Sequence, residues 1–181
     1  MEYSIYYIFV YKGQINGRGC TDCVSDDWLN VEVSKEMFDA VGKYGNDYYI
    51  YSNGEIVNNP NYDKILLDKA KFDKIALNDE LRDTALLSGV TYQNVLFDSD
   101  TDQKVNLLAT VNMMSDEDTI TWYGMDNQGL LCTKADLMAI GRLITELHSF
   151  CWNMNAYIKE QIEEAGTLEE LEKIEINYNR Q

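Results

Sequence analysis

The sequence is poor in proline, histidine and basic residues. It has one proline, one histidine and 15 lysines and arginines against 31 aspartates and glutamates, so its net charge is −16. Such a charge repels phosphate backbones and anionic membrane surfaces, which argues against nucleic acid and membranes as partners. Residues 90–181 carry 6 basic and 16 acidic side chains. This segment would suit a basic partner, although an acidic surface also favours solubility.

Long apolar runs and paired metal-binding motifs are absent as well. No stretch approaches the roughly 18 apolar residues that cross a bilayer, and the first ten residues lack the basic start of a signal peptide. Cys20 and Cys23 have the spacing of half a zinc site, but no second such pair follows. We therefore expect a cytosolic chain with reduced, structural cysteines, no membrane insertion and no bound metal.

Residues 1–61 are predicted to form a small β-rich module. Residues 3–11 are dense in Tyr, Ile, Phe and Val, and Lys12–Gly13 follows as a turn. Asn53–Gly54 lies between two further β-forming runs, and both residues accept the positive φ of a tight hairpin turn. A short helix over 34–41 is expected, with Ser34 as its N-cap.

Three tyrosines of this module are candidate partner-binding residues. Tyr48, Tyr49 and Tyr51 alternate between the faces of a strand, so at least one should reach solvent. Exposed tyrosines are frequent in protein interfaces. Simple strand formation is the alternative interpretation.

Residues 62–88 are predicted to form a connecting helix that ends at Ser88–Gly89. Its apolar residues make only a narrow stripe among lysines and aspartates: Ile65, Phe72, Ile75 and Leu86. A stripe this narrow buries little by itself, so the helix should pack on one domain or self-associate in a dimer or trimer.

Residues 89–181 are predicted to form a domain with two hairpins and a long helix, which makes the chain an α+β protein. The first hairpin, 90–97, turns at Gln93–Asn94, and the second, 119–132, has a polar turn over 125–129. Between them a helix is expected over 100–114. Residues 174–178 alternate as an edge strand does.

The long helix opens at Thr133, with Asp136 completing a variant of the capping box. Apolar residues then recur at steps of three and four along one face. They are Leu137, Ile140, Ile144, Leu147, Cys151, Met154, Ile158 and Ile162. Gly166 should end this helix, and Thr167 should cap a further short one.

Three aspartates at alternate positions, Asp98, Asp100 and Asp102, have the spacing that begins a calcium loop. Such a loop also needs glycine at position 6 and glutamate at position 12. Gln103 and Ala109 stand there instead. We therefore interpret the stretch as a helix start, capped by Asp98 or Ser99, with carboxylates at the positive end of the helix dipole.

No catalytic constellation can be assembled from the sequence. The single histidine, His148, lies on the long helix, where a packed or boundary role is expected. Glycine-rich stretches are not followed by a helical pattern, so a phosphate loop is absent. Runs of paired acids are typical of solvated faces, and spacing alone does not place two of them across a cleft. We predict that the chain is not an enzyme and holds no cofactor.

One cluster is a candidate ligand site. Trp122, Tyr123, Asp126 and Asn127 lie on and around the second predicted hairpin, and an aromatic ring beside amide and carboxylate groups suits glycan recognition. The alternative places Trp122 in the core, because tryptophan is buried on average and this one lies mid-strand.

Residues 90–178 resemble a domain of unknown function found near the C-termini of tail-fibre and tail-fibre-assembly proteins of tailed bacteriophages. The matching stretches are 89–100, Asn106–Leu107, 121–127, 133–141, His148 with Cys151, and 174–176. The family often has Asn-Gly in its first hairpin, where this chain has Gln93–Asn94. Residues 48–62 are similar to a short module of small phage tail-region proteins.

These resemblances imply a phage or prophage origin and a role at the tail, and they supply no catalytic residues. The function expected from them is a tail-fibre assembly chaperone or a minor tail-fibre component that binds a tail-fibre or other tail protein. It would act in the host bacterial cytoplasm during assembly, or as part of the virion tail. The alternative is a receptor-binding module that recognises host surface glycans.

Overall fold

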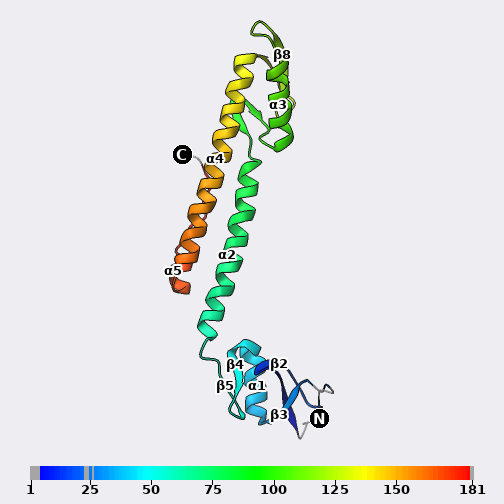
Figure 1. The fold of residues 1–181 in the computed structure, drawn as a ribbon, viewed down its shortest axis with the longest axis vertical. Helices are drawn as coiled ribbons and strands as arrows, with labels where there is room; N and C mark the ends of the chain where they lie inside the picture. The colour runs from blue at the N-terminus through cyan, green and yellow to red at the C-terminus, as the bar shows by residue number, and fades with distance from the viewer. Residues whose placement is uncertain (1–4, 23–24, 26, 180–181) are drawn as a thin grey trace. The chain divides into compact units, whose positions relative to one another are not determined.

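The protein forms two compact units, residues 1–69 and 70–181, in a computed structural model that describes residues 5–22, 25 and 27–179 (Figure 1). Helix α2, Tyr62–Leu86, begins in unit 1 and continues into unit 2. Most of the predicted connecting segment therefore belongs to the second unit. Antiparallel sheets and helices occur in both units, so the predicted α+β class is confirmed.

Unit 1 is built on a five-stranded antiparallel sheet of order β3-β1-β2-β4-β5. Its strands are β1 (Tyr6–Tyr11), β2 (Gln14–Gly19), β3 (Leu29–Val33), β4 (Tyr49–Ser52) and β5 (Glu55–Asn58). Helix α1, Lys35–Tyr44, precedes a short 3-10 turn, η1, over Asn46–Tyr48. The Ser34 hydroxyl accepts the backbone N–H of Met37, which confirms the predicted cap.

Tight turns join neighbouring strands where the sequence predicts them. Lys12–Gly13 has φ values of 51° and 80°, and Asn53–Gly54 has 53° and 92°. Positive φ at both central residues matches the right-handed twist of the strands. One face of the sheet packs with α1 into a core of Ile8, Val10, Ile15, Val41 and Tyr49. Residue 3, where the first predicted strand begins, lies outside the described residues.

Unit 2 packs two hairpins and α3 against one long helix. Its elements after α2 are β6 (Val90–Tyr92), β7 (Val95–Phe97), α3 (Thr101–Met113), β8 (Thr119–Tyr123), β9 (Gly129–Thr133), α4 (Lys134–Glu164) and α5 (Leu168–Glu172). The pairs β6–β7 and β8–β9 are the two predicted hairpins. Gln93 and Asn94 form the first turn with φ values of 48° and 65°.

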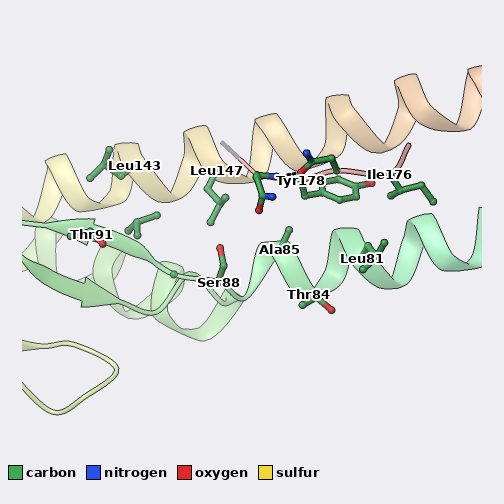
Figure 2. Close-up of a pocket in the computed structure, with 13 residues that line it drawn as sticks. Leu81, Thr84, Ala85, Ser88, Thr91, Leu143, Leu147, Ile176 and Tyr178 are labelled. Carbon is green, nitrogen blue, oxygen red and sulfur yellow. Dashed lines mark hydrogen bonds between the residues drawn. The ribbon is translucent and has the colours of Figure 1, made fainter. Parts of the chain in front are cut away.

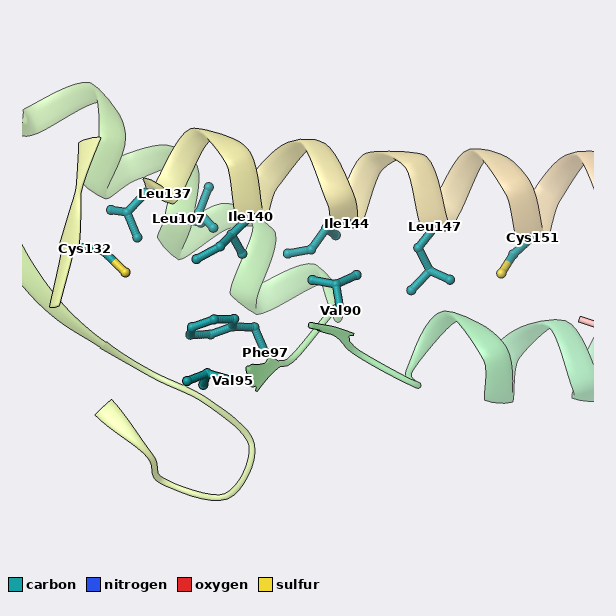
Figure 3. Packing of buried hydrophobic residues seen from close by; sticks show 10 residues of the cluster. All are labelled: Val90, Val95, Phe97, Leu107, Cys132, Leu137, Ile140, Ile144, Leu147 and Cys151. Carbon is teal, nitrogen blue, oxygen red and sulfur yellow. The ribbon is translucent and has the colours of Figure 1, made fainter. Parts of the chain in front are cut away.

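The core of unit 2 follows the buried face of α4 (Figure 3). Leu137, Ile140 and Ile144 are fully buried there, opposite Phe97 of β7 and Leu107 of α3. The predicted capping box is present, since Thr133 and Asp136 exchange hydrogen bonds between side chain and backbone. The predicted face is wrong at one position: Asn155, not Met154, is buried, because α2 supplies polar groups at that level.

Helix α2 runs beside α4 in unit 2 (Figure 1). The Lys71 ammonium donates to the Glu163 carbonyl and the Lys74 ammonium to the Leu171 carbonyl, so α2 supplies positive charge at the carbonyl ends of α4 and α5. The predicted apolar stripe is wrong at Phe72, which is 72% exposed. The face directed at α4 is partly polar instead.

Two further predictions for unit 2 are wrong. Asp100, not Asp98 or Ser99, caps α3, because its carboxylate accepts the N–H of Gln103 at 2.7 Å. Ser99 is buried and joins the two ends of a loop, donating to the Leu86 carbonyl and accepting from Gly89 N–H. Residues 174–178 form no strand; their alternate half-buried side chains pack without a partner strand.

Candidate functional site

An apolar groove lies between α3 and α4 in unit 2. Its volume is about 520 Å³. Val105 and Leu108 of α3 are 59% and 62% exposed, and Met138 of α4 is 58% exposed. The other lining residues are Thr101, Lys104, Leu107, Val111, Gly141, Ile144 and Thr145. Large aliphatic side chains are rarely gathered at such exposure unless something binds there.

The amphipathic pattern of α3 explains the groove. Its apolar residues occupy two faces: Leu107 and Val111 turn toward the core, whereas Val105 and Leu108 turn outward. Only the inner face packs on α4. Gly141 brings the two helices close, since a Cβ there would lie 3.0 Å from a methyl group of Leu107. The sequence carried this signal, because apolar residues on both sides of a helix cannot all be covered by one neighbour.

The groove is nearly free of the negative charge that marks the chain. Helix α3 carries one acidic side chain, Asp102, and one basic one, Lys104. Facing it, the α4 residues 138–145 add only Arg142. Although the chain has a net charge of −16, an approaching protein meets little repulsion at this groove.

Lys104, which lines the groove, lies beside His148 of α4. The Nε2 atom of His148 lies 2.7 Å from the carbonyl oxygen of Ser99, so that nitrogen carries the proton. Its Nδ1 atom lies 3.4 Å from the Lys104 ammonium. The predicted boundary role of His148 fits this half-buried position, and its ring ties α4 to the start of α3.

A second cavity, of about 590 Å³, lies between α2, α4, β6 and the C-terminal segment (Figure 2). Leu81 and Ala85 of α2 line one side, and Leu143 and Leu147 of α4 line the other. Tyr178 closes one end of it. Its lining offers hydroxyl, amide and backbone groups but no cluster of titratable side chains.

The predicted ligand residues of the second hairpin do not converge. Trp122 packs against the core, and its indole nitrogen is buried without an acceptor among the described residues. Tyr123 points the opposite way and is 62% exposed, as strand alternation requires. Asp126 accepts the backbone N–H of Gln128, and Asn127 supplies a positive φ of 62°, so both shape the turn.

The predicted partner-binding tyrosines of unit 1 are packed together. Tyr49 is buried in the core, whereas Tyr48 and Tyr51 are half-buried and reach solvent in part; partner binding by these tyrosines stays a prediction. The ring of Tyr48 lies 4.8 Å from those of Tyr49 and Tyr62 and 4.9 Å from that of Tyr44. The cluster lies where strand β4 begins, and Tyr44, 47% exposed, is its outer member.

Sequence reasoning missed a buried polar network between α2 and α4. Asn78 is fully buried, and its amide donates to the Asn155 carbonyl at 3.1 Å. The Asn155 amide donates to Asp79, which also accepts from Arg82. The sequence offered one sign of this network: Asn155 directly follows Met154 of the predicted apolar series, so a polar side chain could lie at the edge of the buried face of α4.

Chemically reactive groups are not assembled among the described residues. No three of their His, Cys, Asp and Glu side chains could share a metal ion, and Cys23 of the half zinc motif lies outside them. Burial raises the pKa of the Cys132 thiol, which keeps it protonated and unreactive. Hydrogen bonds from Thr133 lower the pKa of Asp136, as a helix cap requires. Among these residues no helix is long and apolar enough to cross a bilayer.

Comparison with protein families matches residues 69–178 to a family described as Domain of unknown function (DUF4376). The chain belongs to this family. The DUF4376 domain starts within one residue of the boundary between the two units and includes most of α2, whereas the sequence resemblance began at residue 90. A search of curated proteins and a search of solved structures each found no significant match.

Proposed function

We propose that this protein is a non-enzymatic, tail-associated protein of a bacteriophage or prophage. It acts by binding a tail-fibre or other tail protein, either as an assembly chaperone in the host cytoplasm or as a minor fibre component retained in the virion tail. The resemblance of residues 90–178 to domains of tail-fibre and tail-fibre-assembly proteins supports the biological setting. The α3–α4 groove supports the mode of action.

The groove is the single observation that carries this proposal. Val105, Leu108 and Met138 hold more than half of their surface in solvent at one site, and burying each on a partner stabilises the complex by about 1 kcal/mol or more. Residues Val105 and Leu108 stand at i and i+3 of a helix, the spacing with which helices pack together. An apolar helix or strand of a partner would fill the space above Gly141.

Co-purification with the tail-fibre protein of the same phage tests the proposal. Leu108→Glu places a charge in the groove without disturbing the core, since Leu108 is 62% exposed. We expect it to weaken binding by about tenfold or more, as loss of a central apolar anchor does. Phe72→Glu is the matched control, because Phe72 is 72% exposed on α2, outside the groove, and should leave binding unchanged.

Retention of the fibre protein by Leu108→Glu at wild-type affinity would contradict the groove as the binding site. Failure of the wild-type chain to bind any fibre or tail protein of its phage would contradict the function itself. Concentration-dependent dimers that Leu108→Glu abolishes would identify the groove as a homo-oligomer interface instead. Light scattering of both variants separates these outcomes.

A further inference from the structure

The sheet of unit 1 has a second face, turned away from α1, along which aromatic side chains follow one strand. Ile8 and Val10 of β1 are buried under α1. Side chains alternate along a strand, so Tyr7, Phe9 and Tyr11 lie on the opposite face. All three are half-buried, and each keeps part of its ring accessible to solvent. Residue spacing along a strand places successive rings about 7 Å apart.

Two glycines of the neighbouring strand keep this face flat. Gly17 pairs with Phe9 and Gly19 with Tyr7 in the register of β1 and β2. A Cβ at Gly19 would lie 2.8 Å from the tip of the Phe9 ring, and one at Gly17 would lie 3.4 Å from its side. The ring of Phe9 therefore lies across the backbone of β2, and a side chain at Gly19 would displace it, whereas a Cβ at Gly17 would only contact it.

Trp28, just before β3, completes the aromatic surface. Its ring centroid lies 6.5 Å from that of Phe9 and 6.4 Å from that of Tyr11, in tilted arrangements. It is half-buried, so part of the indole faces solvent. Four aromatic side chains thus line one face of a small sheet, and none of them belongs to the α1 core.

Carboxylates border the aromatic surface at the Tyr7 end. Glu32 of β3 is opposite Tyr7 in register and is exposed. The Tyr7 hydroxyl is hydrogen-bonded to the side chain of Asp22, and this bond raises the pKa of Tyr7. Two exposed carboxylates therefore lie beside the rings. A carboxylate has about four lone-pair sites and Tyr7 uses one of those of Asp22, so both carboxylates can still accept hydrogen bonds from a ligand.

A sugar ring has the two complementary surfaces that this face requires. Its axial C–H groups are weakly positive and pack on the negative faces of aromatic rings, and its hydroxyls donate to carboxylates at its edge. We propose that the face formed by Phe9, Tyr11 and Trp28, with Asp22 and Glu32 at its border, binds a neutral oligosaccharide. The site is separate from the α3–α4 groove, so the inference does not rest on the proposed tail-protein binding.

Charge selects the class of sugar. Residues 1–61 carry 4 basic and 9 acidic side chains. The Lys12 ammonium lies 5.0 Å from the ring centroid of Tyr11 at one end of the face, but the two carboxylates at the other end would repel uronic acids, sialic acids and phosphate-bearing wall polymers. Neutral hexoses and N-acetylhexosamines meet no such repulsion. A proline-rich peptide is the rival occupant of an aromatic surface, but it lacks the rows of hydroxyl donors that two adjacent carboxylates would accept.

Isothermal titration calorimetry of the full chain with the hexasaccharides of N-acetylglucosamine and of glucose tests the inference. We expect binding of at least one of them, with a dissociation constant in the millimolar to micromolar range. Trp28→Ala should weaken it about fivefold or more, the value of one aromatic stacking contact. Trp152→Ala is the matched control, because Trp152 is a 52% exposed tryptophan of α4 in the other unit and should leave affinity unchanged.

Glu32→Gln provides a second variant that does not depend on how well Trp28→Ala folds. Glu32 is exposed, so the fold should be retained, and loss of a charged acceptor should weaken binding by about threefold or more. Absence of heat and of amide shifts in NMR spectra with both hexasaccharides would overturn the inference. Affinity that is unchanged in both Glu32→Gln and a correctly folded Trp28→Ala would also overturn it. So would tighter binding of a polyproline decapeptide than of either hexasaccharide.

Discussion

The hydroxyl of Tyr178 donates to the side-chain oxygen of Asn78 at 2.7 Å, although the two residues are 100 positions apart. Asn78 is fully buried on α2, and Tyr178 belongs to the extended segment after α5. The amide of Asn78 in turn donates to the carbonyl of Asn155 on α4. One buried asparagine therefore connects three segments of unit 2. Its side chain gives hydrogen-bond partners to the buried Asn155 carbonyl and the Tyr178 hydroxyl, which an apolar side chain could not do.

Loss of the Tyr178 hydroxyl should destabilise unit 2. In Tyr178→Phe, the ring still packs between α2 and α4, but the buried Asn78 oxygen loses its donor. An unsatisfied buried acceptor costs about 1–3 kcal/mol, and we expect the free energy of unfolding to fall by that amount in urea denaturation. Tyr123→Phe removes a hydroxyl from a 62% exposed ring and should change it by less than about 0.5 kcal/mol. Equal effects of the two substitutions would contradict the role of the Asn78 network.

Patterns confined to one element were sufficient to predict much of this fold. The turn at Gln93–Asn94 and the capping box of Thr133 with Asp136 depend on residues at most three positions apart, so they can be read from the chain. The buried face of α4 follows from helical periodicity except at Asn155, which is buried in place of Met154. The hairpins and the caps at Ser34 and Thr133, and with them the α+β class, are therefore predictable without tertiary information, whereas the cap of α3 was not.

Contacts between distant segments were not predictable, for a physical reason. The stripe on α2 is narrow, so periodicity did not show that Phe72 faces solvent or that Asn78 faces α4. The alternation of residues 174–178 is equally compatible with a strand edge and with the surface of a helix pair. The groove exists because α4 covers only one side of α3. Val105 and Leu107 are both apolar, so the sequence does not show that Leu107 is buried and Val105 exposed. Only packing distinguishes them.

Glycine at position 89 is required by both conformation and space. Its φ is +80°, and a Cβ there would lie 2.7 Å from the carbonyl oxygen of Phe97. Gly45 has a similar φ of +88°, but a Cβ added there would have no atom within 4 Å. Gly45 combines this φ with a ψ of 167°, a backbone region that is essentially restricted to glycine, so Gly45→Ala should cost about 1–3 kcal/mol. Gly89→Ala should cost clearly more, because the backbone must also shift.

Differential scanning calorimetry of the two glycine variants checks this comparison, with each variant assessed on the transition of its own unit. Gly45 lies in unit 1 and Gly89 in unit 2. A loss of stability in Gly89→Ala no larger than in Gly45→Ala would show that the loop between α2 and β6 relaxes to admit a side chain.

The Thr133 cap should contribute measurably to the stability of α4. Its hydroxyl accepts the N–H of Asp136 at 3.2 Å, and its own N–H donates to the Asp136 carboxylate at 2.8 Å. Thr133→Ala should lower the free energy of unfolding by about 1 kcal/mol. Thr133→Ser keeps the hydroxyl and should retain most of the stability. Chemical denaturation of both variants tests the cap, and equal losses would instead attribute the effect to the methyl group of threonine.

The depressed pKa of Asp136 makes the stability of unit 2 depend on acid pH. Hydrogen bonds from Thr133, and then from the Tyr92 hydroxyl at 2.7 Å, hold this pKa below the ordinary value of 3.8. A carboxylate whose pKa is lower in the folded state stabilises the fold above its unfolded pKa and loses that contribution as the pH falls through the folded one. The free energy of unfolding should therefore decline as the pH drops below the ordinary value.

Asp136→Asn should flatten this decline, because asparagine has no proton to bind, while at neutral pH the variant should be less stable than the wild type. Tyr92→Phe removes one of the hydrogen bonds and should flatten the decline partially. The pKa of Asp118 is also depressed, by the backbone N–H of Ser115, but neither substitution affects that site. The difference between wild type and variant therefore isolates Asp136. Parallel pH profiles of wild type and Asp136→Asn in urea titrations would show that the acid sensitivity arises elsewhere.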